Sequence, residues 1–239
     1  EVLGNERTDC LIENQCCSNG VLNMTHLALH FSRYVNGVSM RHEEVTRNIF
    51  GNYQIDAITN GVHAATWTSP AFSRLYDRFI PQWRRDNLYL KYAIRIPLDD
   101  IRKAHAEAKS ELFVEIERRT GVHLDAQAMT IGFARRTTEY KQPGLLYRDM
   151  ERLKRMVQRG WRLQIIYGGK AHPRDEPGKE LIRKAFGAAD ALKSSIPVVY
   201  LEEYDVTLAK YVCSGVDLWL NTPRKPQEAS GTSGMKAAL

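Results

Sequence analysis

Apolar residues follow two different spacings along the chain, and each spacing predicts its own kind of element. Between residues 99 and 119 they recur every three or four positions, which is typical of one face of a helix. Asp99 or Asp100 is suited to cap its start, and Gly121 to end it. A second helix is expected over residues 21–33. The residues that share the apolar face of the longer helix are Ile101, Ala104, Ala108, Leu112 and Ile116.

From residue 129 onward, short apolar runs alternate with helical segments. The runs cover residues 129–134, 163–167, 198–201 and 217–220, and each is short enough to be a buried strand. Helices are expected between them: one with Leu146, Met150, Leu153 and Val157 on one face and Gly160 past its end, then 178–193 and 206–213. Strands joined by helices predict an α/β fold, a Rossmann-like doubly wound parallel sheet with right-handed crossovers.

Candidate binding residues fall where these strands end. Arg135 and Arg136 follow the first strand, Gly168 and Gly169 the second, and Tyr204 the third. The segment 228–236 comes after the fourth strand. Because ligands of parallel sheets bind beyond the carboxyl ends of the strands, the pattern gathers these residues at one edge.

The segment 228–236 has a composition suited to anions. It is rich in glycine and hydroxyl residues and carries Lys236 where we expect a helix to begin. Backbone N–H groups at such a turn can bind phosphate, and the lysine can act as a fixed cation or form a Schiff base with pyridoxal phosphate. Arg135, Arg136 and Lys141 add three cations within seven residues. A plain helix-capping loop and a solvated basic face are the alternatives.

Composition narrows the function classes. Hydrophobic residues make up 43% of the 239 positions and charged residues 26%, as in globular proteins, and no apolar run reaches the length of a membrane span. The net charge is +6, but basic and acidic residues are intermixed, which argues against nucleic acid and suits anionic small molecules. His26 and His30 have no third ligand, so no metal site is predicted. Cys10, Cys16, Cys17 and Cys213 lack metal-ligand spacing, which favours reduced thiols and a cytoplasmic location.

Six segments, in order, resemble the α-glucan (glycogen, starch and maltodextrin) phosphorylases. They are Ser32-Arg33-Tyr34-Val35-Asn36-Gly37-Val38, Thr59-Asn60-Gly61-Val62, residues 132–136 with Tyr140-Lys141, Gly168-Gly169-Lys170-Ala171, Leu201-Glu202-Glu203-Tyr204, and residues 228–239. The sequence of the last segment is similar to that of the shorter bacterial and archaeal members of this family. Arg33 departs from the animal enzymes, which have histidine there.

The resemblance implies a GT-B architecture of two Rossmann-like domains. Residues 1–58 would then be the helical end of the N-terminal domain, and residues 59–239 the first half of the C-terminal domain, ending just after the cofactor lysine. We read the chain as a fragment of a longer protein, and we expect the fragment alone to be inactive.

The same resemblance implies a glycosyltransferase that uses pyridoxal phosphate to cleave α-1,4-glucan with inorganic phosphate, releasing glucose 1-phosphate. It allows a homo-oligomer. Lys236 would carry the cofactor, with Thr232, Ser233 and Arg135 at the cofactor phosphate. Arg136 and Lys141 would hold the substrate phosphate. Residues implied at the glucosyl hydroxyls are Asn60, Glu228, Ser230 and Gly231, and those near the cofactor ring are Trp67 and Tyr204.

Two other functions stay open at this point. One is a nucleotide-sugar glucosyltransferase of the same architecture, such as a glycogen synthase, which does not need Met235-Lys236. The other is a binding module without catalysis. Bound pyridoxal phosphate in the full-length protein separates the first from a phosphorylase, and an activity assay with and without the missing parts tests the second.

Overall fold

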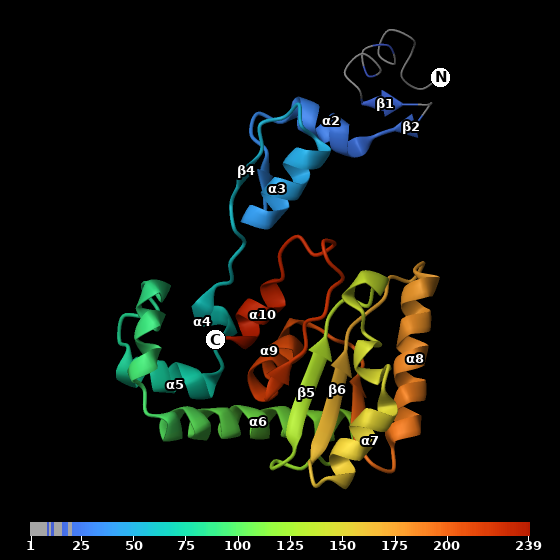
Figure 1. The fold of residues 1–239 in the computed structure, drawn as a ribbon. Helices are drawn as coiled ribbons and strands as arrows, with labels where there is room; N and C mark the ends of the chain where they lie inside the picture. Colours follow the sequence, from blue (N-terminus) through green and yellow to red (C-terminus); the bar gives the residue numbers. More distant parts are fainter. Residues whose placement is uncertain (1–8, 10, 12–15, 19–20) are drawn as a thin grey trace. The chain divides into compact units, whose positions relative to one another are not determined.

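The computed structural model describes residues 9, 11, 16–18 and 21–239 (Figure 1). The chain divides into two compact units, residues 1–60 and residues 61–239. Cys10, one of the thiols assigned above to a reducing compartment, lies outside the described residues.

The first unit contains short strands and two helices. Its elements are β1 (Cys17–Ser18), β2 (Val21–Leu22), α2 (Met24–Phe31), β3 (Asn36–Gly37), α3 (Met40–Ile49) and β4 (Asp56–Ala57), with β1–β2 antiparallel and β3–β4 parallel. The helix predicted over 21–33 is therefore too long. Asn23 sets its start, because its side chain accepts hydrogen bonds from the backbone N–H groups of Thr25 and His26.

The second unit begins with helices around a small core of their own. They are α4 (Ala64–Trp67), α5 (Pro70–Phe79), the 3₁₀ segment η1 (Asn87–Arg95) and α6 (Leu98–Thr120). The predicted face of α6 is confirmed at Ala104, Ala108, Leu112 and Ile116, which are buried, and at the left-handed Gly121, with φ 69°. The predicted cap is wrong. Pro97 occupies the cap position, and Asp99 and Asp100 lie in the first turn, where their charges favour the helix dipole.

A four-stranded parallel sheet forms the centre of the second unit. Its strands are β5 (Met129–Ala134), β6 (Leu163–Gly168), β7 (Val198–Leu201) and β8 (Leu218–Trp219), in the order β7-β6-β5-β8. All neighbours are parallel, and β5 pairs with β6 along its whole length. The strands predicted at 129–134 and 198–201 are confirmed. The fourth is shorter than predicted, because only Leu218 and Trp219 pair with β5.

Helices connect the strands. The elements are η2 (Glu139–Lys141), η3 (Leu145–Tyr147), α7 (Met150–Gln158), α8 (Glu176–Leu192), α9 (Val206–Gly215) and α10 (Thr232–Ala237). Leu146 belongs to η3 and not to the predicted helix, because the side chain of Asp149 caps α7 at the Arg152 N–H. Asp175 likewise starts α8 two residues earlier than predicted.

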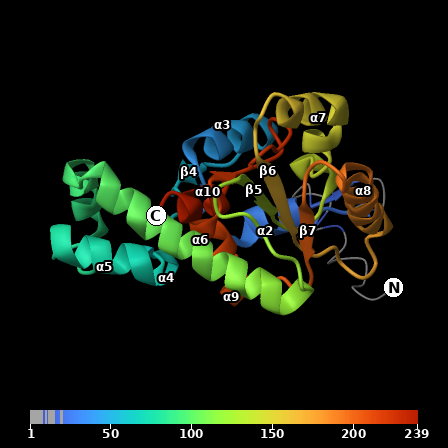
Figure 2. The ribbon, with the colours of Figure 1, turned by 90° about the horizontal axis from the view of Figure 1, so that it is seen from below.

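The two faces of the sheet carry different helices (Figures 1 and 2). On one face, α6 and α9 bury Leu112, Ile116, Leu208 and Val212 against Ile166 and Leu201. On the other, α7 and α8 bury Leu153, Ala185 and Leu192 against Phe133 and Ile165. The fold is thus mixed α/β with a parallel sheet that has helices on both sides, and the two central strands β5 and β6 are buried on both faces.

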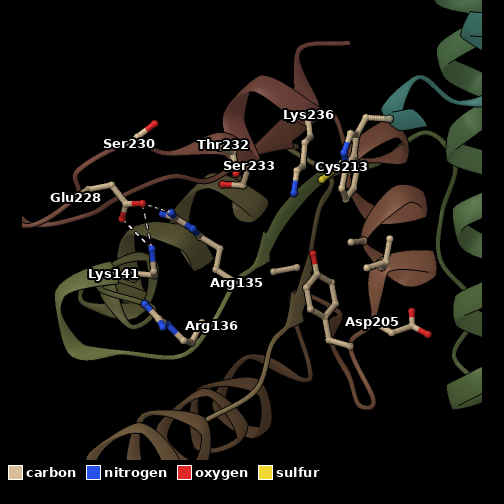
Figure 3. Close-up of a pocket in the computed structure, with 15 residues that line it drawn as sticks. Arg135, Arg136, Lys141, Asp205, Cys213, Glu228, Ser230, Thr232, Ser233 and Lys236 are labelled. Carbon is tan, nitrogen blue, oxygen red and sulfur yellow. Dashed lines mark hydrogen bonds and ion pairs between the residues drawn. The ribbon is translucent and has the colours of Figure 1, made fainter. Parts of the chain in front are cut away.

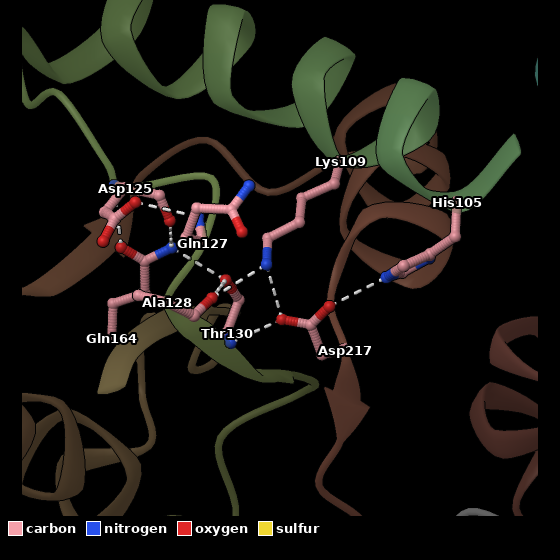
Figure 4. A network of polar contacts seen from close by, with 8 residues as sticks. All are labelled: His105, Lys109, Asp125, Gln127, Ala128, Thr130, Gln164 and Asp217. Atoms are coloured by element: carbon pink, nitrogen blue, oxygen red, sulfur yellow. Dashed lines mark hydrogen bonds and ion pairs between the residues drawn. The ribbon is translucent and has the colours of Figure 1, made fainter. Parts of the chain in front are cut away.

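A polar network ties α6 to the amino ends of the strands (Figure 4). The buried Lys109 ammonium lies 2.7 Å from an Asp217 carboxylate oxygen and 2.8 Å from the Ala128 carbonyl. The same oxygen of Asp217 accepts from the Thr130 N–H at 2.7 Å, and its other oxygen lies 2.8 Å from His105 Nε2. Partial burial raises the pKa of Asp217, but these hydrogen bonds outweigh it and hold the pKa below its usual range.

The described residues contain neither a membrane-spanning helix nor a metal-binding cluster. In the part of the chain that the structure describes, no helix combines the length and apolar character needed to cross a membrane. Nor do the described residues contain a cluster of three His, Cys, Asp or Glu side chains arranged to hold a metal ion. The ring of His26, one of the two histidines considered above, packs edge-on against Phe50 with 5.1 Å between centroids.

Replacing Asp217 by alanine is expected to lower the free energy of unfolding by about 3 kcal/mol, because Lys109 would be left buried without its counter-charge. Denaturant unfolding of the chain measures this. Glu107→Ala is the matched control, since Glu107 pairs with Arg74 on the exposed surface, where an ion pair contributes less than about 1 kcal/mol.

The Asp217→Ala substitution should also change how the stability of the chain depends on pH. The pKa of Asp217 is lowered in the fold, so its stabilisation is present above the unfolded pKa of about 3.9 and is lost as the pH falls below it. Stability of the unsubstituted chain should therefore fall more steeply below about pH 4 than that of Asp217→Ala. Two results would contradict the assigned role of the network. One is the same dependence of stability on pH in the unsubstituted chain and in Asp217→Ala, and the other is an equal loss of unfolding free energy in Asp217→Ala and Glu107→Ala.

Candidate functional site

A cavity of about 490 Å³ opens at the carboxyl edge of the sheet (Figure 3). Its wall is built from the end of β5, from the segments that follow β5, β7 and β8, from α9 and α10, and from the end of α4. Ten of the twelve predicted site residues line it: Trp67, Arg135, Arg136, Lys141, Tyr204, Glu228, Ser230, Thr232, Ser233 and Lys236. The parallel strands bring these residues together although they are up to 169 positions apart in the sequence, from Trp67 to Lys236.

The other two predicted residues, Gly231 and Asn60, do not line the cavity. Gly231 is the N-cap of α10, and a Cβ placed on it would lie 3.3 Å from the Asn221 side-chain amide and 3.9 Å from a Glu228 carboxylate oxygen. It therefore keeps the loop close to those two side chains. Asn60 is the last residue of the first unit, where it is exposed and donates its backbone N–H to the Val38 carbonyl at 3.0 Å.

Two of the three cations that follow β5 meet one carboxylate. Glu228 accepts from Arg135 at 2.9 Å and from the Lys141 ammonium at 2.8 Å and 3.1 Å. Arg135 also donates to the side-chain oxygen of Asn221. The side chains of Arg135 and Lys141 are only 6% and 8% exposed, so their charges depend on this pairing.

Arg136 differs from its neighbour in being exposed. In Figure 3 its guanidinium lies on the same side of the cavity as Lys141. Burial acts to raise the pKa of the Tyr140 hydroxyl, but hydrogen bonds with Lys141 and Arg136 outweigh it and lower that pKa. The shift has this direction because two cations face the Tyr140 hydroxyl, and a nearby positive charge favours its ionised form.

The sequence pattern predicted that a helix begins at Lys236, and this prediction is wrong. The helix α10 starts at Thr232, and Lys236 lies in its last turn. The amine projects into the cavity between Ser233 and Cys213 (Figure 3) and lies 3.8 Å from the centroid of the Trp67 ring. Such a contact stabilises an ammonium on the ring face. No carboxylate in the described part of the chain forms an ion pair with this amine.

Two neutral groups lie on the opposite wall. Burial raises the pKa of the Cys213 thiol to about 12, and the positive charge of Lys236 offsets only part of that rise. Burial also raises the pKa of the Tyr204 hydroxyl. The ring of Tyr204 lies against the end of β6, where a Cβ on Gly168 would come within 3.2 Å of it. Both groups stay protonated at neutral pH, so they add no negative charge. The carboxylate on this side is that of Asp205, which caps α9 by accepting from the Leu208 N–H at 2.7 Å (Figure 3).

Two loops are joined directly beneath the cations. Arg135 donates its backbone N–H to the Gly168 carbonyl, and Thr137 donates to the Lys170 carbonyl, both at 3.1 Å. Gly169 adopts φ +141°, and a Cβ on it would lie 1.9 Å from the Arg135 carbonyl oxygen. The Gly168-Gly169 pair thus has a packing role here, because only glycine permits this approach of one backbone to the other.

Comparison with known proteins adds what geometry alone does not give. A family model described as carbohydrate phosphorylase matches residues 6–239. The chain belongs to the carbohydrate phosphorylase family.

Its relatives in this family come from distant organisms. The chain is 41% identical to the maltodextrin phosphorylase of Thermococcus litoralis, 38% to the glycogen phosphorylase of Aquifex aeolicus and 33% to that of Mycobacterium tuberculosis. Each match covers 91% of this chain but only 29%, 35% and 28% of the relative. The chain therefore spans about a third of the length of these phosphorylases.

Sequence reasoning did not assign three side chains that belong to the cavity or its wall. Asn221 supports Arg135, Tyr140 bonds to the cations, and Cys213 faces Lys236. A signal was present for Asn221, which comes directly after the strand predicted over 217–220, as Arg135 does after β5. Cys213 gave none, because a thiol on the buried side of a helix has the same pattern as core packing.

Gly169→Ala is expected to lower the free energy of unfolding by more than about 2 kcal/mol, because the methyl group clashes with the Arg135 carbonyl and φ +141° strains any other residue. Gly144→Ala is the matched control: Gly144 lies in the same region with negative φ, and a Cβ there meets nothing within 4 Å. Thermal or denaturant unfolding compares the two. Similar small losses would show that the β5 and β6 loops can separate freely.

Proposed function

We propose that this chain is the cofactor- and phosphate-binding part of an α-glucan phosphorylase that depends on pyridoxal phosphate. Family membership supports the class of reaction, and the relatives carry the names maltodextrin phosphorylase and glycogen phosphorylase. The observation that carries the proposal is a single cavity that combines the Lys236 amine with three cations, Arg135, Arg136 and Lys141.

The residues present fit the cofactor. Ser233 Oγ is buried without a hydrogen-bond partner, and an acceptor such as a phosphate oxygen would satisfy it. The Lys236 amine has no carboxylate partner in the described chain, and a cavity of about 490 Å³ lies within the range of small-molecule sites. Lys236 would hold the cofactor covalently, with Thr232, Ser233 and Arg135 at its phosphate and Trp67 and Tyr204 beside its ring. The chemistry that the cofactor supplies is that of its phosphate group, which takes part in proton transfer.

The cations have a second task in this proposal. Arg136 and Lys141 would bind inorganic phosphate, the nucleophile that replaces water in glucan cleavage. Two phosphate groups side by side repel strongly, and clustered cations offset that repulsion. Glu228, Ser230 and Gly231 would bind hydroxyl groups of the sugar. The same role for Asn60, a residue of the first unit, stays a prediction from the resemblance.

The architecture of the full-length protein is part of the same proposal. Residues 59–239 would form the first half of a Rossmann-like domain, and residues 1–58 the end of the preceding domain of a GT-B enzyme. A nucleotide-sugar glucosyltransferase is disfavoured, because the matched family and its named relatives are phosphorylases. A cytoplasmic location and a homo-oligomeric state stay predictions.

Borohydride reduction of the full-length protein with pyridoxal phosphate, followed by peptide mapping, is expected to place the label on Lys236. Lys236→Arg keeps the charge over the Trp67 ring but cannot form the covalent link, so it should retain no reducible cofactor. Lys236→Ala should behave likewise. A label on Lys170 or Lys141 would contradict the assignment.

Arg136→Ala in the full-length protein should leave the cofactor content unchanged, raise the KM for phosphate and lower kcat. Loss of a charge-assisted contact costs about 1.5–3 kcal/mol, which corresponds to one to two decades in kcat/KM. Initial rates of glucose 1-phosphate formation measure this. Arg155→Ala is the control, since Arg155 is an exposed residue of α7 outside the cavity lining. Equal phosphate kinetics in the two variants would remove Arg136 from the site.

A further inference from the structure

Two of the cations assigned to phosphate groups already have an anion. Glu228 lies within 2.8 Å of Lys141 through one carboxylate oxygen and within 2.9 Å of Arg135 through the other. Its side chain is 16% exposed, whereas the two basic side chains are almost fully buried. The Glu228 carboxylate therefore bridges Arg135 and Lys141 from the cavity side.

The bridge resembles a phosphate contact in its chemistry. A carboxylate and a phosphate both offer two oxygens to a guanidinium or an ammonium, and arginine binds either one in the same forked geometry. The donor hydrogens of Lys141 that point to Glu228 are therefore those that a phosphate would need. Both anions cannot use them at once, because each would then repel the other at short range.

We propose that Glu228 is an internal competitor of inorganic phosphate: in the unliganded site it occupies Lys141, with Arg135 as its second partner, and phosphate binds to Lys141 by displacing the carboxylate. This rests on the proposed function, because it concerns the same phosphate site. The sugar-binding role assigned to Glu228 then becomes available only after phosphate has displaced it. Phosphate and sugar binding are coupled through one side chain, which moves from cations to hydroxyl groups.

The surroundings of Glu228 permit this exchange. It lies between β8 and α10, outside any helix or strand, and rotation about its side-chain torsions moves the carboxylate without unfolding the loop. The loop itself is held at Arg224, whose N–H donates to the Tyr140 carbonyl at 2.7 Å. Asn221 still bonds to Arg135 after the carboxylate leaves, so this buried guanidinium keeps one partner.

The test is titration of the 239-residue chain with inorganic phosphate at constant ionic strength, by calorimetry. Glu228→Gln keeps the size of the side chain and removes its charge, so phosphate should bind about tenfold more tightly or better. In the absence of phosphate this variant should have a lower Tm than the original chain, since two buried cations lose their anion. The rise in Tm on adding phosphate should be larger.

Glu228→Asp separates competition from simple repulsion. It keeps the negative charge but is one methylene shorter, so it bridges Arg135 and Lys141 less well. Displacement predicts tighter phosphate binding than in the original chain, whereas long-range repulsion alone predicts no change. This variant also keeps the test decisive if Glu228→Gln does not fold.

Two controls locate the effect. Glu203→Gln removes an exposed carboxylate that pairs with Lys170 at 3.4 Å, and it should leave phosphate affinity unchanged. Adding Lys141→Gln to Glu228→Gln should abolish the gain. Unchanged or weaker phosphate binding by a folded Glu228 variant would overturn the proposal, and so would the absence of phosphate binding by every variant.

The outcome is independent of the cofactor experiment. Lys236 can carry the label while Glu228→Gln leaves phosphate affinity unchanged, in which case the phosphorylase assignment holds and the competition is refuted. The reverse result, tighter phosphate binding with no label on Lys236, would support an anion exchange at Glu228 in a protein without the proposed cofactor.

Discussion

The parallel register of β5 on β6 determines where the polar chemistry of the second unit gathers. Six residues of each strand pair in step, so Ala134 and Gly168 end at the same level. Polar groups that follow them then share one edge, because the strands are parallel and their carboxyl ends meet there. Gly169 lets the loop after β6 pack directly against the backbone of Arg135, one of the cations of the cavity.

Much of this arrangement follows from sequence pattern. The bounds of β5 and β7 were predictable, because apolar runs of four to six residues between turn residues leave little choice of length. The edge location of Arg135, Tyr204 and Lys236 was also predictable, since parallel strands direct their carboxyl ends the same way. Resemblance to the phosphorylases supplied the roles, which the pattern alone left open between a binding loop and a helix cap.

Other features depend on contacts that no local pattern encodes. Glu228 lies 93 residues from Arg135 in the sequence, and nothing near either residue indicates that they pair. The start of α10 was misplaced because Gly231, Ser233 and Gly234 are typical of a loop, yet tertiary packing holds them in or next to a helical turn. Caps formed by Asn23 and Asp149 shifted two other helix starts in the same way.

The contact between Lys236 and Trp67 has a spectroscopic consequence. An ammonium held 3.8 Å from the centre of an indole ring perturbs the excited state of that ring, so the emission of Trp67 depends on what the amine is doing. Trp83, by contrast, is enclosed in an apolar cluster, with its indole N–H bonded to Asp77. Of the four tryptophans in the chain, Trp67 is the one whose emission should change when the Lys236 amine leaves the ring. The site thus contains its own optical reporter, readable without an attached dye.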